Sequence, residues 1–110
     1  MTPAPQNLTL PALFGLQGRV AYVSGGYGGI GSEIARGLAL AGAKVAVSGR
    51  SAEKADAFAT TLRGEGHDAL GLAMDAHHAG DIAAAVDRAA AHFGALDMLI
   101  NCVGIQREER

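Results

Sequence analysis

The chain has 110 residues, which suits one domain that buries roughly two-thirds of its unfolded surface. Its composition is 49% hydrophobic and 18% charged, which excludes a disordered segment, and its net charge of −2 gives no sign of nucleic-acid or anionic-membrane partners. One cysteine cannot form an internal disulfide, and no apolar run reaches the ~20 residues of a membrane span. No basic residue precedes Arg19, unlike in a signal or transit peptide, so we expect a cytoplasmic protein.

Strand and helix patterns alternate along most of the chain. Residues 1–17 are expected to form an N-terminal arm, because prolines at positions 3, 5 and 11 interrupt regular structure. Short β-rich runs then predict strands, and apolar residues at helical spacing predict helices. The strands are expected at 19–24, 44–48, 69–74 and 96–101, and the helices at 30–41, 51–63 and 81–93. The apolar faces of the first and last helices comprise Ile30, Ile34, Ala35, Leu38 and Ala41, and Ile82, Val86, Ala89, Ala90 and Phe93.

This β-α-β-α-β-α-β order predicts right-handed crossovers and a parallel sheet, and therefore an α/β fold of the Rossmann-type, doubly wound class. In that class these strands lie in the order 3-2-1-4. The sheet would be incomplete, because strand 96–101 would be an unpaired edge and a single helix would cover one face. We therefore expect residues 18–110 to form a dinucleotide-binding half-domain that is marginally folded alone or associates with other chains.

The most informative segment is the glycine cluster between the first strand and the first helix, residues 24–31. Glycines there permit a tight turn and let the N–H groups of a helix N-terminus approach a pyrophosphate. Three spacings are compatible with such a turn: Gly26, Gly28 and Gly31; Gly25, Gly28 and Gly31; or Gly25, Gly29 and Gly31. No Lys-Ser/Thr pair follows, which argues against an ATP-binding P-loop. An ordinary flexible turn is the alternative, although so many glycines would then cost conformational entropy without purpose.

Four motifs follow one another along the chain. They are Ser24-Gly25-x-x-x-Gly29-Ile30-Gly31, Asp75-Ala76, Phe93-Gly94-x-Leu96-Asp97 and Asn101-Cys102-Val103-Gly104. Together they resemble the N-terminal half of a short-chain dehydrogenase/reductase, from about Leu16 to the end of the chain. The segment Leu13-Phe14-x-Leu16-x-Gly18-Arg19-Val20-Ala21 also resembles the gluconate 5-dehydrogenase-type group. The sequence departs from the family where Ser24 replaces a threonine and where Cys102 and Val103 replace Asn and Ala.

The resemblance implies an oxidoreductase that transfers hydride between NAD or NADP and a secondary alcohol or ketone. It assigns cofactor contacts to Gly25, Gly26, Tyr27, Gly29, Ile30, Gly31, Arg50, Asp75, Ala76, Asn101 and Gly104. Gly49 stands where NAD-selective members carry an acid, and Arg50 follows it, which favours NADP and leaves NAD as the alternative. The structural alternatives are a solvated charge for Arg50 and a turn aspartate for Asp75.

The resemblance also implies a catalytic serine, tyrosine and lysine, and none can be assigned. Tyr22 and Tyr27 are the only tyrosines, and glycines, not lysines, stand four positions after them. We therefore expect the catalytic residues to follow residue 110 and, by resemblance, a full-length homotetramer. The alternative is a dinucleotide-binding module, or a truncated product, without activity.

Two other candidate sites are expected to be structural. The adjacent histidines His77 and His78 lie near Asp75, but they point apart and lack a further ligand at a usual spacing, so we expect no metal site. Cys102 has no base beside it in the sequence, which favours a buried thiol over a nucleophile.

Overall fold

The computed structural model describes residues 15–102, so most of the predicted arm (1–14) and the segment 103–110, which includes Gly104, lie outside the described residues. Strands and helices alternate along the described chain as predicted, with small shifts at their ends. The elements are β1 (Val20–Ser24), α2 (Gly29–Leu40), β2 (Lys44–Gly49), α3 (Ala52–Gly64), β3 (Ala69–Ala73), α4 (Ala79–Phe93) and β4 (Met98–Asn101). Among the described residues, no helix is both long and apolar enough to cross a membrane.

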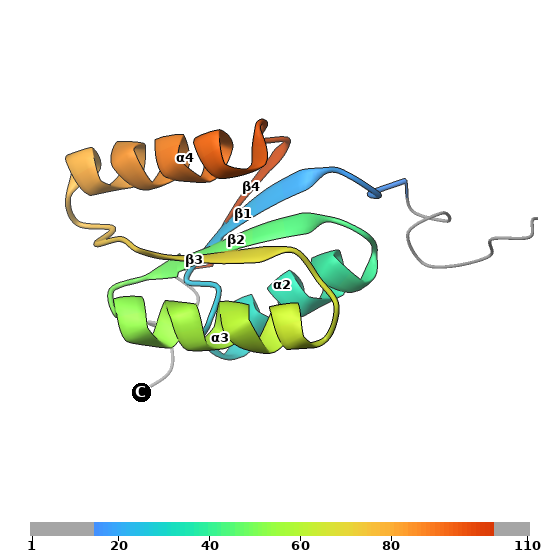
Figure 1. Cartoon of the computed structure of the whole chain (residues 1–110). Coiled ribbons are helices and arrows are strands. Elements are labelled where there is room, and N and C mark those ends of the chain that lie inside the picture. Colours follow the sequence, from blue (N-terminus) through green and yellow to red (C-terminus); the bar gives the residue numbers. More distant parts are fainter. Residues whose placement is uncertain (1–14, 103–110) are drawn as a thin grey trace, which may run out of the picture.

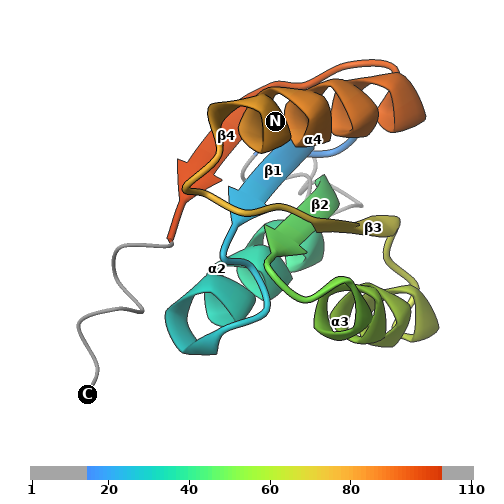
Figure 2. The same cartoon turned by 90° about the vertical axis from the view of Figure 1, so that its left-hand side faces the viewer.

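The four strands form one parallel sheet in the order β3-β2-β1-β4, which confirms the predicted topology (Figure 2). In its register, Tyr22 at the centre of β1 lies opposite Ala46 of β2 on one side and Leu99 of β4 on the other. Because β4 pairs only with β1, it is an edge strand in the described part of the chain. The carboxyl ends of all four strands lie at one edge of the sheet, which faces the viewer in Figure 2.

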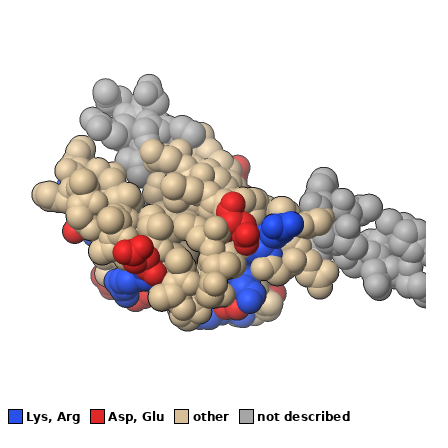
Figure 3. Space-filling model, turned by 90° about the horizontal axis from the view of Figure 1, so that it is seen from above, with Lys and Arg blue, Asp and Glu red and all other residues tan. Residues whose placement is uncertain are grey.

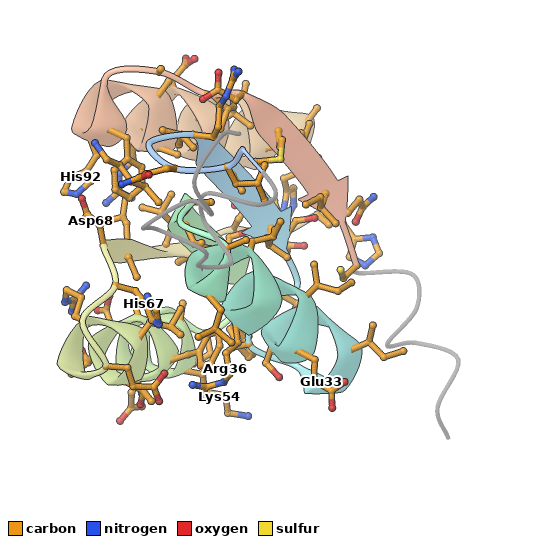
Figure 4. The ribbon with its side chains drawn as sticks, turned by 90° about the vertical axis from the view of Figure 1, so that its right-hand side faces the viewer. Glu33, Arg36, Lys54, His67, Asp68 and His92 are labelled. Atoms are coloured by element: carbon orange, nitrogen blue, oxygen red, sulfur yellow. The ribbon has the colours of Figure 1, made fainter. Side chains whose placement is uncertain are left out.

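Helices cover the two faces of the sheet unequally (Figure 1). Helices α2 and α3 pack on one face, over a core that includes Val23, Val45 and Leu62. These two helices are also joined directly, because the Arg36 guanidinium forms an ion pair with Glu65 and lies 5.7 Å from the centre of the Phe58 ring. Figure 4 shows Arg36 between α2 and α3. Among the described residues, 15–102, helix α4 alone packs on the other face. The sheet is therefore closed on one side and only partly covered on the other, as expected.

The residues that α4 buries differ from the apolar face predicted for this helix. The buried positions of α4 are Ala85 and Ala89, whereas Ile82 is 40% exposed. Alanines stand where the helix comes closest to the sheet, and a larger side chain at its border is left in solvent. Leu99 belongs to the same face and is 63% exposed. Seen from the α4 side, most of the surface is uncharged (Figure 3).

A buried polar contact crosses the centre of the sheet. The Tyr22 hydroxyl donates a 2.8 Å hydrogen bond to Ser48 Oγ, and both residues are almost completely buried. Burial raises the pKa of Tyr22 above its usual value, and the hydrogen bond to Ser48 opposes that shift. Tyr22 is therefore a neutral core residue, which agrees with its expected exclusion from the catalytic role.

Local sequence features explain how two further elements are fixed. The Ser51 side chain caps α3 by accepting a 3.1 Å hydrogen bond from Lys54 N–H. Gly71 allows α3 to pack on β3, because a Cβ there would lie 2.5 Å from the Ala55 carbonyl oxygen.

Candidate functional site

Backbone hydrogen bonds draw the turns after β1, β2 and β3 and the end of β4 together at the carboxyl edge of the sheet. Gly25 N–H donates to the Ser48 carbonyl oxygen at 2.7 Å, and Met74 N–H donates to that of Gly49 at 2.8 Å. Cys102 N–H donates to the carbonyl oxygen of Ser24 at 2.9 Å. This edge is where ligands bind in open α/β sheets. The predicted site residues from 25 to 101 therefore all lie along this edge of the sheet.

The structure gives separate roles to the glycines of the first turn. Gly25 has a φ of +74°, in the left-handed region that favours glycine. A Cβ on Gly31 would lie 2.0 Å from the Gly25 carbonyl oxygen, so the start of α2 packs directly against the turn. A Cβ on Gly26 would lie 2.8 Å from Val47 Cβ. These three glycines are required by the fold itself, whatever the turn binds.

Gly29 is different, because the fold gives no reason for a glycine there. A Cβ at this first position of α2 would meet no heavy atom of the described residues within 4 Å, apart from its chain neighbours and the backbone of its own helical turn. The preceding residue, Gly28, carries no side-chain oxygen, so within the described structure no side chain caps the N–H groups that begin α2. Open backbone at an uncapped helix N-terminus fits a phosphate group, which supports Gly29 in the glycine motif. Ile30 follows it and is 41% exposed instead of buried in the core.

Tyr27 connects the glycine turn to the end of β2. Its hydroxyl accepts a 3.1 Å hydrogen bond from Ser51 N–H. Its ring lies against Gly49, where a Cβ would be 2.1 Å from Tyr27 Cε2. Arg50, between these contacts, is exposed to solvent. The position that carries an acid in NAD-selective sites is therefore occupied by a glycine covered by an aromatic ring.

Asp75 has the environment of a turn aspartate. Its carboxylate accepts a hydrogen bond from His77 N–H at 3.0 Å and lies 3.1 Å from His78 Nδ1. The backbone hydrogen bond from His77 is the main cause that lowers the pKa of Asp75, desolvation opposes it, and the charges of His78 and Arg50 add to the lowering. These contacts explain the position of the Asp75 carboxylate without a ligand. The adenine contacts expected at Asp75 and Ala76 therefore stay predictions.

Asn101 is held at the end of β4 by a partner on β1. The Ser24 hydroxyl donates a 3.0 Å hydrogen bond to Asn101 Oδ1, so the serine that replaces the family's threonine keeps a hydroxyl at this point. Beside it, Cys102 is completely buried in the core on the α2 side. The predicted contact at Gly104 falls outside the described residues.

Cys102 gives a test of this burial. Desolvation raises the pKa of its thiol, and the thiolate is the reactive form, so we expect a thiol reagent such as DTNB to label it at least about tenfold more slowly in the native chain than in denaturant. Stopped-flow absorbance measures both rates. Equal rates in the two conditions would contradict a buried thiol.

The structural role of Asp97 was not predicted from the sequence, because it depends on a strand far away in the chain. The Asp97 carboxylate accepts a 2.9 Å hydrogen bond from Val20 N–H, and Asp97 N–H donates to the Val20 carbonyl oxygen at 2.9 Å. These bonds fix β4 beside β1 at the edge opposite the site. The only signal was the position of Asp97 in a motif. As for metals, the described residues include no group of three His, Cys, Asp or Glu that could hold an ion.

The strand order, the crossovers and the uncapped glycine turn define a Rossmann-type α/β domain. The chain belongs to the short-chain dehydrogenase/reductase family, since the family model described as short chain dehydrogenase matches residues 19–110. Members of this family generally use NAD or NADP.

Individual relatives agree with this assignment. The chain is 41% identical over 107 residues to a D-threitol dehydrogenase from Mycolicibacterium smegmatis, covering 97% of this chain and 41% of the relative. It is 41% identical over 100 residues to a gluconate 5-dehydrogenase from Gluconobacter oxydans, covering 88% and 38% of the two chains. The chain thus spans about two-fifths of the length of these relatives.

Solved structures share the fold. A hydroxysteroid dehydrogenase from Escherichia coli superposes with a TM-score of 0.75 at 34% identity, covering 78% of this chain and 37% of the other. A short-chain dehydrogenase/reductase from Serratia marcescens superposes with a TM-score of 0.73 at 42% identity, covering 78% and 36%. These likenesses agree with the predicted Rossmann-type sheet and the predicted family.

Proposed function

We propose that this chain binds NADP and forms the cofactor-binding part of an oxidoreductase acting on a secondary alcohol or ketone. The observation that carries the proposal is the start of α2. No described side chain caps its N–H groups, and no described residue fills the space at Gly29, which leaves room for a phosphate. Glycines 25, 26 and 31 shape this turn, and it lies at the carboxyl edge of the sheet beside Arg50, Asp75 and Asn101.

The residues present fit a dinucleotide. The N–H groups at residues 29–31 would hold its pyrophosphate, and Arg50 would bind the 2′-phosphate of NADP. Asp75, Ala76, Asn101 and Gly104 would contact its nucleoside parts. The nicotinamide of the bound cofactor supplies the hydride chemistry. A carboxylate at position 49 would repel a 2′-phosphate, and the glycine there removes that repulsion.

The role of Arg50 gives the first test. We expect Arg50→Ala to weaken NADPH binding about tenfold or more, because a hydrogen bond to a charged group contributes about 1.5–3 kcal/mol. NADH has no 2′-phosphate, so its binding should change by less than about twofold. Isothermal titration of both cofactors measures the two constants. Arg88→Ala, which removes an exposed arginine from α4, is the matched control. Equal losses for both cofactors would reject a 2′-phosphate contact.

A dinucleotide-binding module without activity is the second candidate. It is favoured by one observation: Tyr22 is buried in the core and Tyr27 lies in the glycine turn, so neither can act as the acid or base of hydride transfer. We expect the pure 110-residue chain to bind the cofactor without dehydrogenase turnover on alcohols or ketones. A cytoplasmic location and a tetrameric full-length enzyme also stay predictions.

A further inference from the structure

Tyr27 occupies the space that a side chain at the end of β2 would need. A Cβ on Gly49 would lie 2.1, 2.4 and 2.5 Å from Cε2, Cζ and the hydroxyl oxygen of Tyr27, all closer than real Cβ contacts. The outer half of the ring therefore lies directly on the Gly49 α-carbon. A side chain at position 49 and the ring in this place exclude each other.

A backbone hydrogen bond just after β2 orients the Tyr27 hydroxyl. It accepts the Ser51 N–H at 3.1 Å, and this bond ties a side chain of the β1–α2 turn to the residue that caps α3. A phenol both accepts and donates hydrogen bonds. Because the oxygen already accepts from Ser51, the hydroxyl proton is the group that it offers to a ligand.

We propose that Tyr27 determines cofactor specificity: its ring excludes an acid at position 49, and its hydroxyl donates to the 2′-phosphate of NADP beside Arg50. This inference rests on the proposed function. The chemistry discriminates between the two cofactors, because a phenol proton and a guanidinium are both donors, and a phosphate supplies only acceptors. The uncharged 2′-hydroxyl of NAD gains less from these donors, and its own proton is best satisfied by an acceptor such as a carboxylate.

The first experiment separates the hydroxyl from the ring. Tyr27→Phe keeps the ring over Gly49 and removes the donor, so we expect the Kd for NADPH to rise about tenfold and that for NADH to change by less than about twofold. Isothermal titration of the 110-residue chain measures both constants, and circular dichroism checks the fold. Tyr22→Phe, which removes a hydroxyl from the core, is the matched control and should not change the ratio of the two constants.

The second experiment tests the exclusion between residues 27 and 49. We expect Gly49→Asp alone to leave NADH binding weak, because the ring, held by the Ser51 N–H, stands where the Cβ of residue 49 must go. Gly49→Asp combined with Tyr27→Ala should bind NADH about tenfold more tightly than Gly49→Asp alone. Equal NADH binding by the single and double variants would overturn the steric role.

The outcomes distinguish this inference from the proposed function. If the wild-type chain prefers NADPH but Tyr27→Phe leaves the ratio of the two constants unchanged, the inference fails and the proposed function stands. If the wild-type chain prefers NADH or binds neither cofactor, both fail.

Discussion

Replacing Gly31 by alanine is expected to lower the free energy of unfolding by about 3 kcal/mol and to abolish dinucleotide binding. The new Cβ would lie 2.0 Å from the Gly25 carbonyl oxygen and 3.1 Å from Gly26 Cα. These are backbone atoms, so the clash cannot be relieved by rotating a side chain. Chemical denaturation followed by circular dichroism measures the loss.

Two other glycines of α2 provide matched controls. Gly37 is exposed, and a Cβ there meets nothing within 4 Å among the described residues, so Gly37→Ala should stabilise the helix by about 0.5–1 kcal/mol. Gly29 has equally open surroundings, so Gly29→Ala should also keep the fold. It should nevertheless weaken NADPH binding about tenfold or more, since its methyl group takes the space next to the uncapped N–H groups. Unchanged binding in Gly29→Ala would contradict the role given to this position.

The 110-residue chain alone is expected to self-associate, and Leu99→Lys should weaken that association about tenfold or more. Leu99 is 63% exposed on the edge strand, on the face that α4 leaves partly open. Burying a leucine side chain contributes about 1.5–3 kcal/mol to association. A lysine at this position removes that contribution and adds charge repulsion between the associated chains. Light scattering coupled to size-exclusion chromatography, over a range of concentrations, measures the association.

Leu40 serves as the control for that experiment. It is 48% exposed at the end of α2, so Leu40→Lys changes the charge equally without touching the open face. Association should persist in this variant. A wild-type chain that stays monomeric at every concentration would refute the expected association.

The sequence predicts the fold well because its signals are local. Each strand and helix has its own period, and the strand order follows from the class of βαβ folds. Burial within a helix is harder to predict. The apolar spacing of α4 includes Ile82 and Ala89 alike, but in the folded chain Ala89 is buried in the core against the sheet while Ile82 is 40% exposed.

The candidate site is predictable only in part, because two of its features depend on contacts between distant turns. The glycine spacing leaves three motifs open. The φ of Gly25 and the close approaches at Gly26 and Gly31 separate the glycines that the fold needs from Gly29. The contact of Tyr27 with Gly49 and Ser51 joins residues more than 20 positions apart, which periodicity cannot detect.

The most direct test of the account is a crystal structure of the chain with bound NADP. We expect the pyrophosphate to lie against the N–H groups of residues 29–31 at the start of α2, with the 2′-phosphate next to Arg50. A pyrophosphate bound at any other place, such as the N-terminus of α3 or α4, would contradict the assignment of the glycine turn as the cofactor site.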